Sequence, residues 1–337
     1  MSDDQDSLFP MLPLAAPKAR ARRHPSTGSV PTRRTVRLIE AAAAIHGDAA
    51  DELDFAHTVL CQVGLPYRDP GSDVRTWQRR NGAATLRIDA GAVLDPRSGE
   101  FVDVGLPYGE KPRLALIHLT SEAIRTRSPV IEVADSLTAY VRSLGLPTDG
   151  RTIRTIKEQL TRLSAATVRL GISAQDGSGI QVQGHIVGAF DLWHPNEPDQ
   201  RTFWPSTIRL SQEFYASLER HAVPLDHRAV AALAPSAMAL DTYTWLAQRL
   251  HRVPERKPAL VPWPSLHQQF GPGFARQQDF KRKFLIGLRA ALAVYPDAKV
   301  VQDDRGLLLH HSRPPIAPRA VSARMAPLND PDDGGSR

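Results

Sequence analysis

Apolar side chains recur at every third or fourth position through much of the N-terminal third, which predicts helices. The stretch "TVRLIEAAAA" has this spacing, and "DELDFAHTVLCQVG" shows it again up to Gly64. Beyond the loop "GLPYRDPG", we predict a short helix at Trp77–Arg80 and a strand at Ala84–Ile88, with Asn81-Gly82 as the turn between them. Residues 35–105 are therefore expected to form an N-terminal helical extension.

The middle of the chain has a more complex order of elements. "GLPYGEKPRLALIHLTSEAIRTRS" predicts a helix that starts after Gly109, with Pro112 in its first turn. A short strand "PVIEV" follows, then a helix "SLTAYVRSLG" capped by Asp135, and then the helix "RTIRTIKEQLTRLSAA". The strands "TVRLGI" and "IQVQGHIV" form a hairpin behind them. Helix, strand, helix, turn, helix and hairpin is the order of a winged helix, which we predict over residues 106–200.

The same order recurs nearer the C-terminus. "VPLDHRAVAALAPSAMALDTYTWLAQRLHRV" predicts two helices split near Pro235, and the strand "ALVPW" and the helix "SLHQQFG" follow. The long helix "RQQDFKRKFLIGLRAALAVY" then leads into a hairpin of "KVVQ" and "LLLHH" around the turn "DDRG". Internal repetition of this kind indicates a duplicated module. We expect an α+β fold, mainly α, with two tandem winged-helix domains, the second over residues 201–320.

The two ends of the chain differ from this core in composition. Residues 1–34 change from acidic to basic and are interrupted by proline, and residues 321–337 are polar. We predict that residues 1–34 form a disordered basic arm and that residues 321–337 form a disordered tail.

Charge and cysteine content narrow the function. The 337 residues include 42 Lys and Arg against 36 Asp and Glu, a formal charge of +6 that favours acidic partners, nucleic acid above all. So mild an excess is equally compatible with a basic protein that binds no polyanion. Cys61 is the only cysteine, so neither an internal disulfide nor a thiolate metal cluster is possible. With no apolar run as long as a membrane span, we expect a cytoplasmic protein associated with the nucleoid or a plasmid, and no membrane partner.

The run Lys281-Arg282-Lys283 lies within the last long helix. At about 100° per residue, Phe280, Phe284, Gly287, Leu288 and Ala291 share one side of that helix. The opposite side carries Gln278, Arg282, Leu285 and Arg289, and the two lysines flank the apolar stripe. Arg and amide side chains are those that read base edges in the major groove, whereas lysines suit phosphates. An isolated basic helix is more often a solvated surface, but the place of this one within a winged helix favours DNA.

The corresponding helix of the first domain carries Arg151, Arg154 and Arg162 opposite its apolar side. Backbone contact or a dimer contact is as reasonable there as base readout. The first hairpin could bring Gln181, Gln183 and His185 near a groove. In the second hairpin, two aspartates would repel phosphates, which leaves Arg305 as the plausible contact.

Enzymatic motifs are missing from the sequence. It contains no phosphate-binding G-x-x-x-x-G-K-[ST], no G-x-S-x-G, no H-E-x-x-H and no His-x-His of a rolling-circle nickase. His57 and Cys61 lie one turn apart but are better explained as packed core residues than as metal ligands. We predict a protein without catalytic residues, cofactor or metal.

Several of these stretches together resemble the RepA-type plasmid replication initiators. The resemblance rests on "HTVLCQVGLPYRDPG", "RRNG", "RTIRTIKEQLTRLSAATVRLG" and above all "GLPYGEKPRLALIHLTSEAIRTRS", and runs from about His57 to about His311. It implies an initiator that binds repeated sites (iterons) in double-stranded plasmid origin DNA, promotes origin opening and recruits the host replicative helicase. A dimer–monomer equilibrium and a host initiator as a further partner belong to the same expectation.

The resemblance also assigns roles to residues. Base contacts then fall on Gln277, Gln278, Arg282 and Arg289. Phosphate contacts fall on Arg276, Lys281 and Lys283 in the second domain, where they join Arg305 of the hairpin turn, and on Arg151, Arg154, Lys157 and Arg162 in the first. The basic arm before Thr35 has no counterpart in these motifs.

Two other functions remain open from the sequence. A winged-helix transcriptional regulator that represses its own promoter would show the same surface, and a nickase or relaxase is the less favoured alternative. Replication of a plasmid that carries only this gene and its flanking repeats would distinguish an initiator from a regulator. A covalent tyrosyl adduct on cleaved origin DNA would indicate a nickase.

Overall fold

The fold is known from a computed structural model, which describes residues 31–95, 98–132, 136–173, 179–189 and 207–317. The predictions for the basic arm and the C-terminal tail therefore lie outside the described residues, apart from the last four residues of the arm. There Thr32 caps the first helix, α1 (Arg33–Gly47), by accepting a hydrogen bond from the Thr35 amide.

The N-terminal extension contains more strand than the apolar pattern predicts. After α1 come β1 (Leu53–His57), the short helix α2 (Thr58–Gln62), β2 (Thr76–Asn81), β3 (Ala84–Asp89), β4 (Ala92–Leu94) and β5 (Phe101–Asp103). The helix expected up to Gly64 is wrong in its first half, because β1 pairs with a distant strand and is buried along its whole length. The short helix expected at Trp77–Arg80 is also wrong: β2 is extended and pairs with β3, with Trp77 opposite Ile88. The extension is thus not mainly helical.

The first repeat follows the predicted order. It comprises α3 (Glu110–Thr126), β6 (Val130–Glu132), α4 (Leu137–Ser143), α5 (Gly150–Ala165), β7 (Thr167–Ser173) and β8 (Gly179–His185). Gly109 precedes α3 as predicted. Ser136 caps α4, since its hydroxyl accepts the Ala139 amide, and the predicted cap Asp135 lies outside the described residues. β9 (Val187–Ala189), β10 (Thr207–Leu210) and α6 (Gln212–His221) follow, and β6, β10 and β9 form a small sheet.

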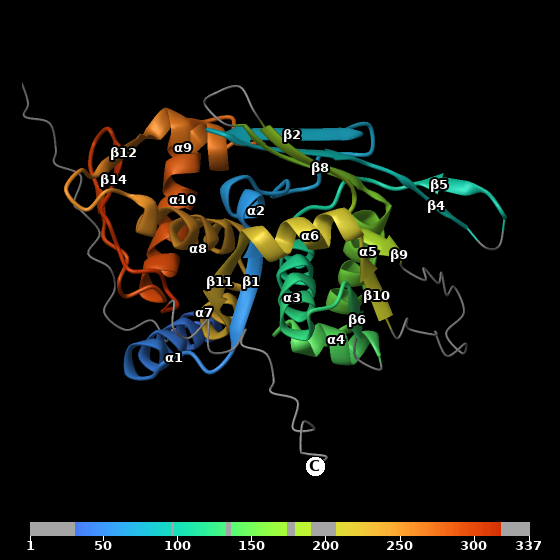
Figure 1. Cartoon of the computed structure of the whole chain (residues 1–337), viewed down its shortest axis with the longest axis horizontal. Coiled ribbons are helices and arrows are strands. Elements are labelled where there is room, and N and C mark those ends of the chain that lie inside the picture. Colours follow the sequence, from blue (N-terminus) through green and yellow to red (C-terminus); the bar gives the residue numbers. More distant parts are fainter. Residues whose placement is uncertain (1–30, 96–97, 133–135, 174–178, 190–206, 318–337) are drawn as a thin grey trace, which may run out of the picture.

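The hairpin of the first repeat is part of a larger sheet. Its order is β2-β3-β7-β8, so the hairpin of the N-terminal extension and that of the first repeat form one antiparallel surface. This sheet lies across the top of the molecule in Figure 1. Leu86, Ile88, Val168 and Leu170 point to its buried side.

The second repeat begins with a strand where a helix was expected. β11 (Ala222–Asp226) pairs with β1, which holds the segment extended before α7 (His227–Leu233). α8 (Ala237–Arg249), a 3-10 turn (Leu250–Arg252), β12 (Ala259–Pro262), α9 (Trp263–Phe270), α10 (Gln277–Ala293), β13 (Val300–Gln302) and β14 (Gly306–Leu309) complete it. The last sheet has the order β12-β14-β13, as expected for a helix-helix unit followed by a hairpin.

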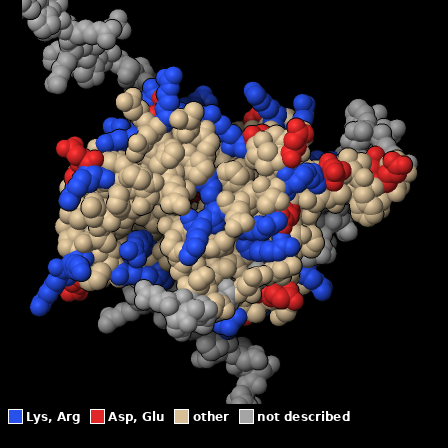
Figure 2. Space-filling model, turned by 90° about the horizontal axis from the view of Figure 1, so that it is seen from above, with Lys and Arg blue, Asp and Glu red and all other residues tan. Residues whose placement is uncertain are grey.

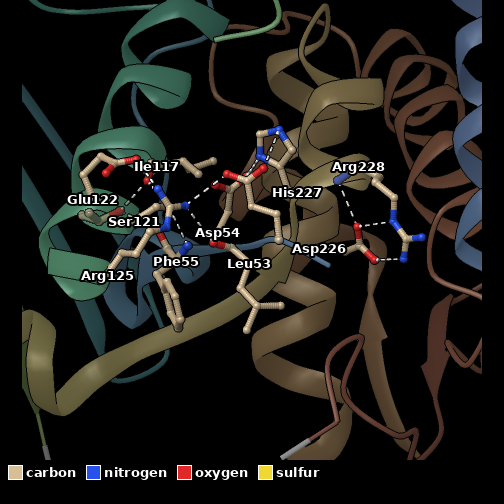
Figure 3. Close-up of polar contacts among 12 residues, drawn as sticks. Leu53, Asp54, Phe55, Ile117, Ser121, Glu122, Arg125, Asp226, His227 and Arg228 are labelled. Atoms are coloured by element: carbon tan, nitrogen blue, oxygen red, sulfur yellow. Dashed lines mark hydrogen bonds and ion pairs between the residues drawn. The ribbon is translucent and has the colours of Figure 1, made fainter. Parts of the chain in front are cut away.

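β1 of the N-terminal extension joins the two repeats, because it pairs with β11 of the second and packs against α3 of the first. Figure 3 shows β1 between α3 and α7, with Asp54 accepting a hydrogen bond from His227 Nδ1 at 3.0 Å. On the other side of β1, the Phe55 amide donates to Ser121 of α3 at 2.8 Å. The repeats therefore have a fixed relation to each other.

Candidate nucleic-acid interface

The orientation of α10 about its own axis is determined by its apolar side. Phe280 and Phe284 are fully buried, and their rings lie 5.4 Å apart by centroid. Gly287 faces α8 so closely that a Cβ atom there would lie 3.0 Å from Cγ of Met238. The five residues predicted to share the buried side are the five that the structure buries. The opposite side of α10 must therefore face solvent.

The exposed side of α10 carries the predicted base-reading residues. Gln277, Gln278, Arg282 and Arg289 are all exposed. The Arg282 side chain is 71% exposed and pairs with Asp279 one turn earlier, at 3.0 Å. Arg289 Nε donates to the Leu285 carbonyl at 3.1 Å. Such exposed, local contacts are weak, so both guanidinium groups can exchange them for a ligand.

The predicted phosphate contacts surround this ridge. Arg276, at the N-cap position, and Lys283 are exposed. Lys281 is half-buried, and its ammonium lies 4.2 Å from the centre of the Trp263 ring, a cation–π contact that directs it along α9. In the hairpin turn, Arg305 is 74% exposed, although Asp303 lies 3.4 Å from its guanidinium. Backbone amides of Gly306 and Arg305 donate to Asp303 and lower the pKa of that carboxyl, so it stays charged beside Arg305.

The predicted phosphate contacts of the first repeat, all on α5, differ in how far they are exposed to solvent. Arg151 and Arg154 are exposed on α5, and Lys157 is half-buried, with a pKa lowered by desolvation. Arg162 is only 16% exposed: it pairs with Glu158 at 2.7 Å and donates to the Leu106 carbonyl at 3.2 Å. Its guanidinium is thus used to hold the chain before α3, which makes it the weakest of the predicted phosphate contacts.

The first turns of α5 and α10 lie in different parts of the molecule. α10 follows α9, which lies at the top of Figure 1, whereas α5 follows α4, which lies at the bottom. The start of α5 is therefore remote from the start of α10. The structure does not gather the two sets of predicted residues into one cluster.

The sheet β2-β3-β7-β8 contributes cationic side chains that sequence reasoning missed. Arg80, Arg87 and Arg169 are on its outer side, together with the predicted Gln181, Gln183 and His185. Because Trp77–Arg80 was predicted to be a helix, Arg80 was not predicted to lie on the outer side of a sheet. The alternation of polar and apolar residues in "TWQRRNGAATLRID" is the signal that would have shown it.

The His57–Cys61 pair is part of the core, as expected. The Val59 amide donates to His57 Nδ1 at 3.2 Å, so Nε2 carries the proton and donates to Ser217 at 3.0 Å. Burial lowers the pKa of His57 to about 4 and raises the pKa of the Cys61 thiol. Among the residues that the structure describes, no group of three or more His, Cys, Asp or Glu side chains is placed to hold a metal ion.

Comparison with known proteins identifies a family for part of the chain. Residues 106–263 match the family described as plasmid encoded RepA protein, a range that ends before α10. Two crystal structures of domains 2 and 3 of RctB are similar at 10% identity. The first, of selenomethionine derivatives, has a TM-score of 0.47, and the matched region covers 76% of this chain and 99% of the RctB chain. The second has a TM-score of 0.45, and the matched region covers 74% of this chain and 94% of the RctB chain. No curated protein sequence matches the chain. No helix in the described part of the chain is long and apolar enough to cross a membrane.

Proposed function

Since residues 106–263 belong to the RepA-type plasmid replication initiator family, we propose that the chain starts plasmid replication by binding repeated sites in double-stranded origin DNA. The observation that carries this proposal is the orientation of α10. Its phenylalanine side is buried, and its ridge of Gln277, Gln278, Arg282 and Arg289 faces solvent.

Both repeats are interpreted as winged helices. In the second, α9, the turn after it and α10 form the helix-turn-helix, and β13 and β14 form the wing. An exposed helix of this kind fits the major groove, where forked arginine donors take guanine O6 and N7, and amide side chains take adenine N6 and N7. Three adjacent cations on one helix repel one another, and that repulsion is relieved when phosphates replace counterions. The basic run therefore has a physical reason once DNA is the ligand.

The first repeat is assigned a supporting role. Arg151, Arg154 and Lys157 would contact the DNA backbone, or a second copy of the chain in a dimer that must separate before it acts. Opening of the origin and recruitment of the host helicase would follow on the bound sites. None of these steps requires a catalytic residue of this chain.

Footprinting of the DNA that flanks the gene tests the proposal directly. Protection should appear as short repeats at regular spacing, and Arg282→Ala should weaken it at every repeat. A plasmid that carries only the gene and these repeats should replicate in a suitable host. Protection of a single promoter site, with no replication of such a plasmid, would instead show a transcriptional regulator. Strand cleavage with the protein attached would show a nickase.

A further inference from the structure

The outer side of the sheet β2-β3-β7-β8 is an open polar surface with a regular arrangement. Because directly paired residues of antiparallel strands point to the same side, the register defines rows across the four strands. The middle row is Gln78, Arg87, Arg169 and Gln183. The adjacent rows are Arg80, Thr85, Gly171 and Gln181 on one side, and Thr76, Asp89, Thr167 and His185 on the other.

The charge of this surface is positive. Three arginines share it with a single aspartate, Asp89, which Thr76, Arg87 and Arg169 all contact. Arg87 remains 45% exposed and Arg169 32% exposed in spite of that pairing. Within the described residues, no carboxylate lies within ion-pair distance of Arg80, whose Nε donates only to the Gly82 carbonyl, at 3.1 Å. Gln181 and Gln183 add amide donors on the outermost strand.

The sheet is attached to the start of α10 by the other side of β2. Arg79, which points inward, donates to the Gln269 carbonyl at 3.1 Å and to the Gln268 carbonyl at 3.4 Å, both at the end of α9. Its guanidinium also lies 4.3 Å from the Trp77 ring centre. Gln269 in turn donates to the Gln62 carbonyl at 2.8 Å. The turn that precedes α10 is thus fixed against the edge of the sheet.

The figures show that both features belong to one side of the molecule. α9 and the sheet lie together at the top of Figure 1, and Figure 2 looks down on that side. Lys and Arg side chains are spread over its middle, and Asp and Glu gather toward the end where the β4–β5 hairpin projects. A polyanion that leaves the N-terminal end of α10 would therefore meet cationic side chains on the sheet.

We propose that this outer face binds the sugar–phosphate backbone of the same origin duplex, beside the segment that α10 reads. The proposal rests on the proposed function and extends it to a second, sequence-independent site. The four strands span about 14 Å between the outer two at about 4.8 Å per step, whereas the major groove is about 12 Å wide and admits a helix or a two-stranded ribbon. The sheet must lie against the backbone rather than enter the groove. None of the outward residues is Phe, Tyr or Trp, so the face lacks the stacking platform that single-stranded DNA uses.

Arg80→Ala is the variant that tests this site, because Arg80 has no acidic partner whose charge would be released. We expect the affinity for the origin duplex to fall about fivefold. The slope of log affinity against log salt concentration should become smaller in magnitude by about 0.9, the value for one phosphate contact. The preference for origin over unrelated DNA should not change. Arg37→Ala, on the exposed side of α1 at the opposite end of the molecule in Figure 1, is the matched control and should leave both quantities unchanged.

A series of duplexes trimmed stepwise on either side of the footprint completes the experiment. For the wild type, trimming one side should reduce affinity, and for Arg80→Ala the same trimming should reduce it less, because Arg87 and Arg169 remain on the face. Wild-type affinity in Arg80→Ala, with Arg282→Ala still impaired, would overturn the sheet site alone. Unchanged DNA binding with altered self-association in sedimentation would show that the face binds a second copy of the chain. Failure of the wild type to bind flanking DNA would overturn the proposed function itself.

Discussion

Arg113 of α3 and Asp241 of α8 form a buried, bidentate ion pair that joins the two repeats. Arg113 Nε lies 2.7 Å from one carboxylate oxygen of Asp241, and Nη2 lies 2.8 Å from the other. The remaining donors of Arg113 reach the carbonyls of Leu65, Pro66 and Gly109. The stretch "GLPYGEKPR", which carries the family resemblance, thus owes its arginine to a structural contact between the repeats.

Removal of one partner of this pair should strongly destabilise the fold. Arg113→Ala leaves Asp241 buried and uncompensated, for which we expect a loss of about 3–5 kcal/mol in the free energy of unfolding. Urea unfolding followed by circular dichroism measures it. Arg125→Ala is the control, since Arg125 is 41% exposed in its pairs with Glu52 and Glu122, and should cost less than about 1 kcal/mol. Equal losses in the two variants would contradict a special role for the buried pair.

Two neighbouring cations of α10 should differ in what they contribute to DNA binding. Arg282→Ala should cost about 1–3 kcal/mol on origin DNA and reduce the preference for it, if Arg282 reads a guanine. Lys283→Ala should weaken binding to all sequences alike and reduce the salt slope. Titrations on origin and scrambled duplexes at several salt concentrations separate the effects. A uniform loss in both variants would show that this helix does not read bases.

The neutral state of His57 predicts a specific loss of stability in acid. Its folded pKa, about 4, is below the ordinary 6.5, because burial and the nearby His221 oppose the charged form. Protonation of His57 therefore favours the unfolded chain. The stabilisation from the neutral imidazole is complete above about pH 6.5, and the free energy of unfolding decreases by up to about 3 kcal/mol as the pH falls through 4. Protonation of Nδ1 would also remove the acceptor of the Val59 amide. In His57→Gln, the difference in unfolding free energy between pH 7 and pH 4.5 should be smaller by about 2 kcal/mol.

His227 should have the opposite dependence on pH. Its hydrogen bond to Asp54 raises the pKa of the imidazole, with Glu52 acting in the same direction and Arg125 against it. The stabilisation is complete below the unfolded pKa and is lost as the pH rises through the raised folded value. Since the side chain is 36% exposed, we expect less than about 1 kcal/mol. His227→Gln should therefore destabilise the protein at pH 6 and leave it nearly unchanged at pH 9, as measured by urea unfolding.

The last sheet, β12-β14-β13, depends on a glycine. A Cβ atom at Gly306 would lie 2.0 Å from the Val261 carbonyl oxygen of the paired strand, so Gly306→Ala must break the β12–β14 register. We expect a loss of more than about 2 kcal/mol and faster amide exchange in β14. Gly150→Ala is the matched control. It lies at the start of α5 with no atom within 4 Å of its Cβ position, and should be neutral or stabilising by up to about 1 kcal/mol.

Local pattern was sufficient to predict most of the helices and their buried sides. The periodicity around Phe280 and Phe284 identified the buried side of α10, and hence which cations are exposed. The order of helices, strands and hairpins in both repeats could also be predicted, apart from β11 at the start of the second, because each turn residue acts on its own segment. Exposure of Arg282 and Arg289 follows directly from that periodicity.

The extended segments and their partners were decided by tertiary contacts. Leu53–His57 has the apolar spacing of a helix, yet it pairs with Ala222–Asp226, far away in the chain, and burial on both sides of the strand outweighs local propensity. Trp77–Asn81 differs from this case, because it pairs with β3 close by in the sequence and its alternation of polar and apolar residues would have indicated a strand. Arg162 was predicted to face DNA, but Glu158 and the Leu106 carbonyl take its donors.

The sequence by itself thus determined which faces of its helices are apolar, since that depends only on residue spacing along one helix. Only the tertiary structure decided that β3 pairs with β7, far away in the chain, and therefore that Arg80 and Arg87 share one surface with Arg169. The reason is physical: a strand leaves its hydrogen-bonding groups unpaired until a partner arrives, and no local pattern identifies that partner.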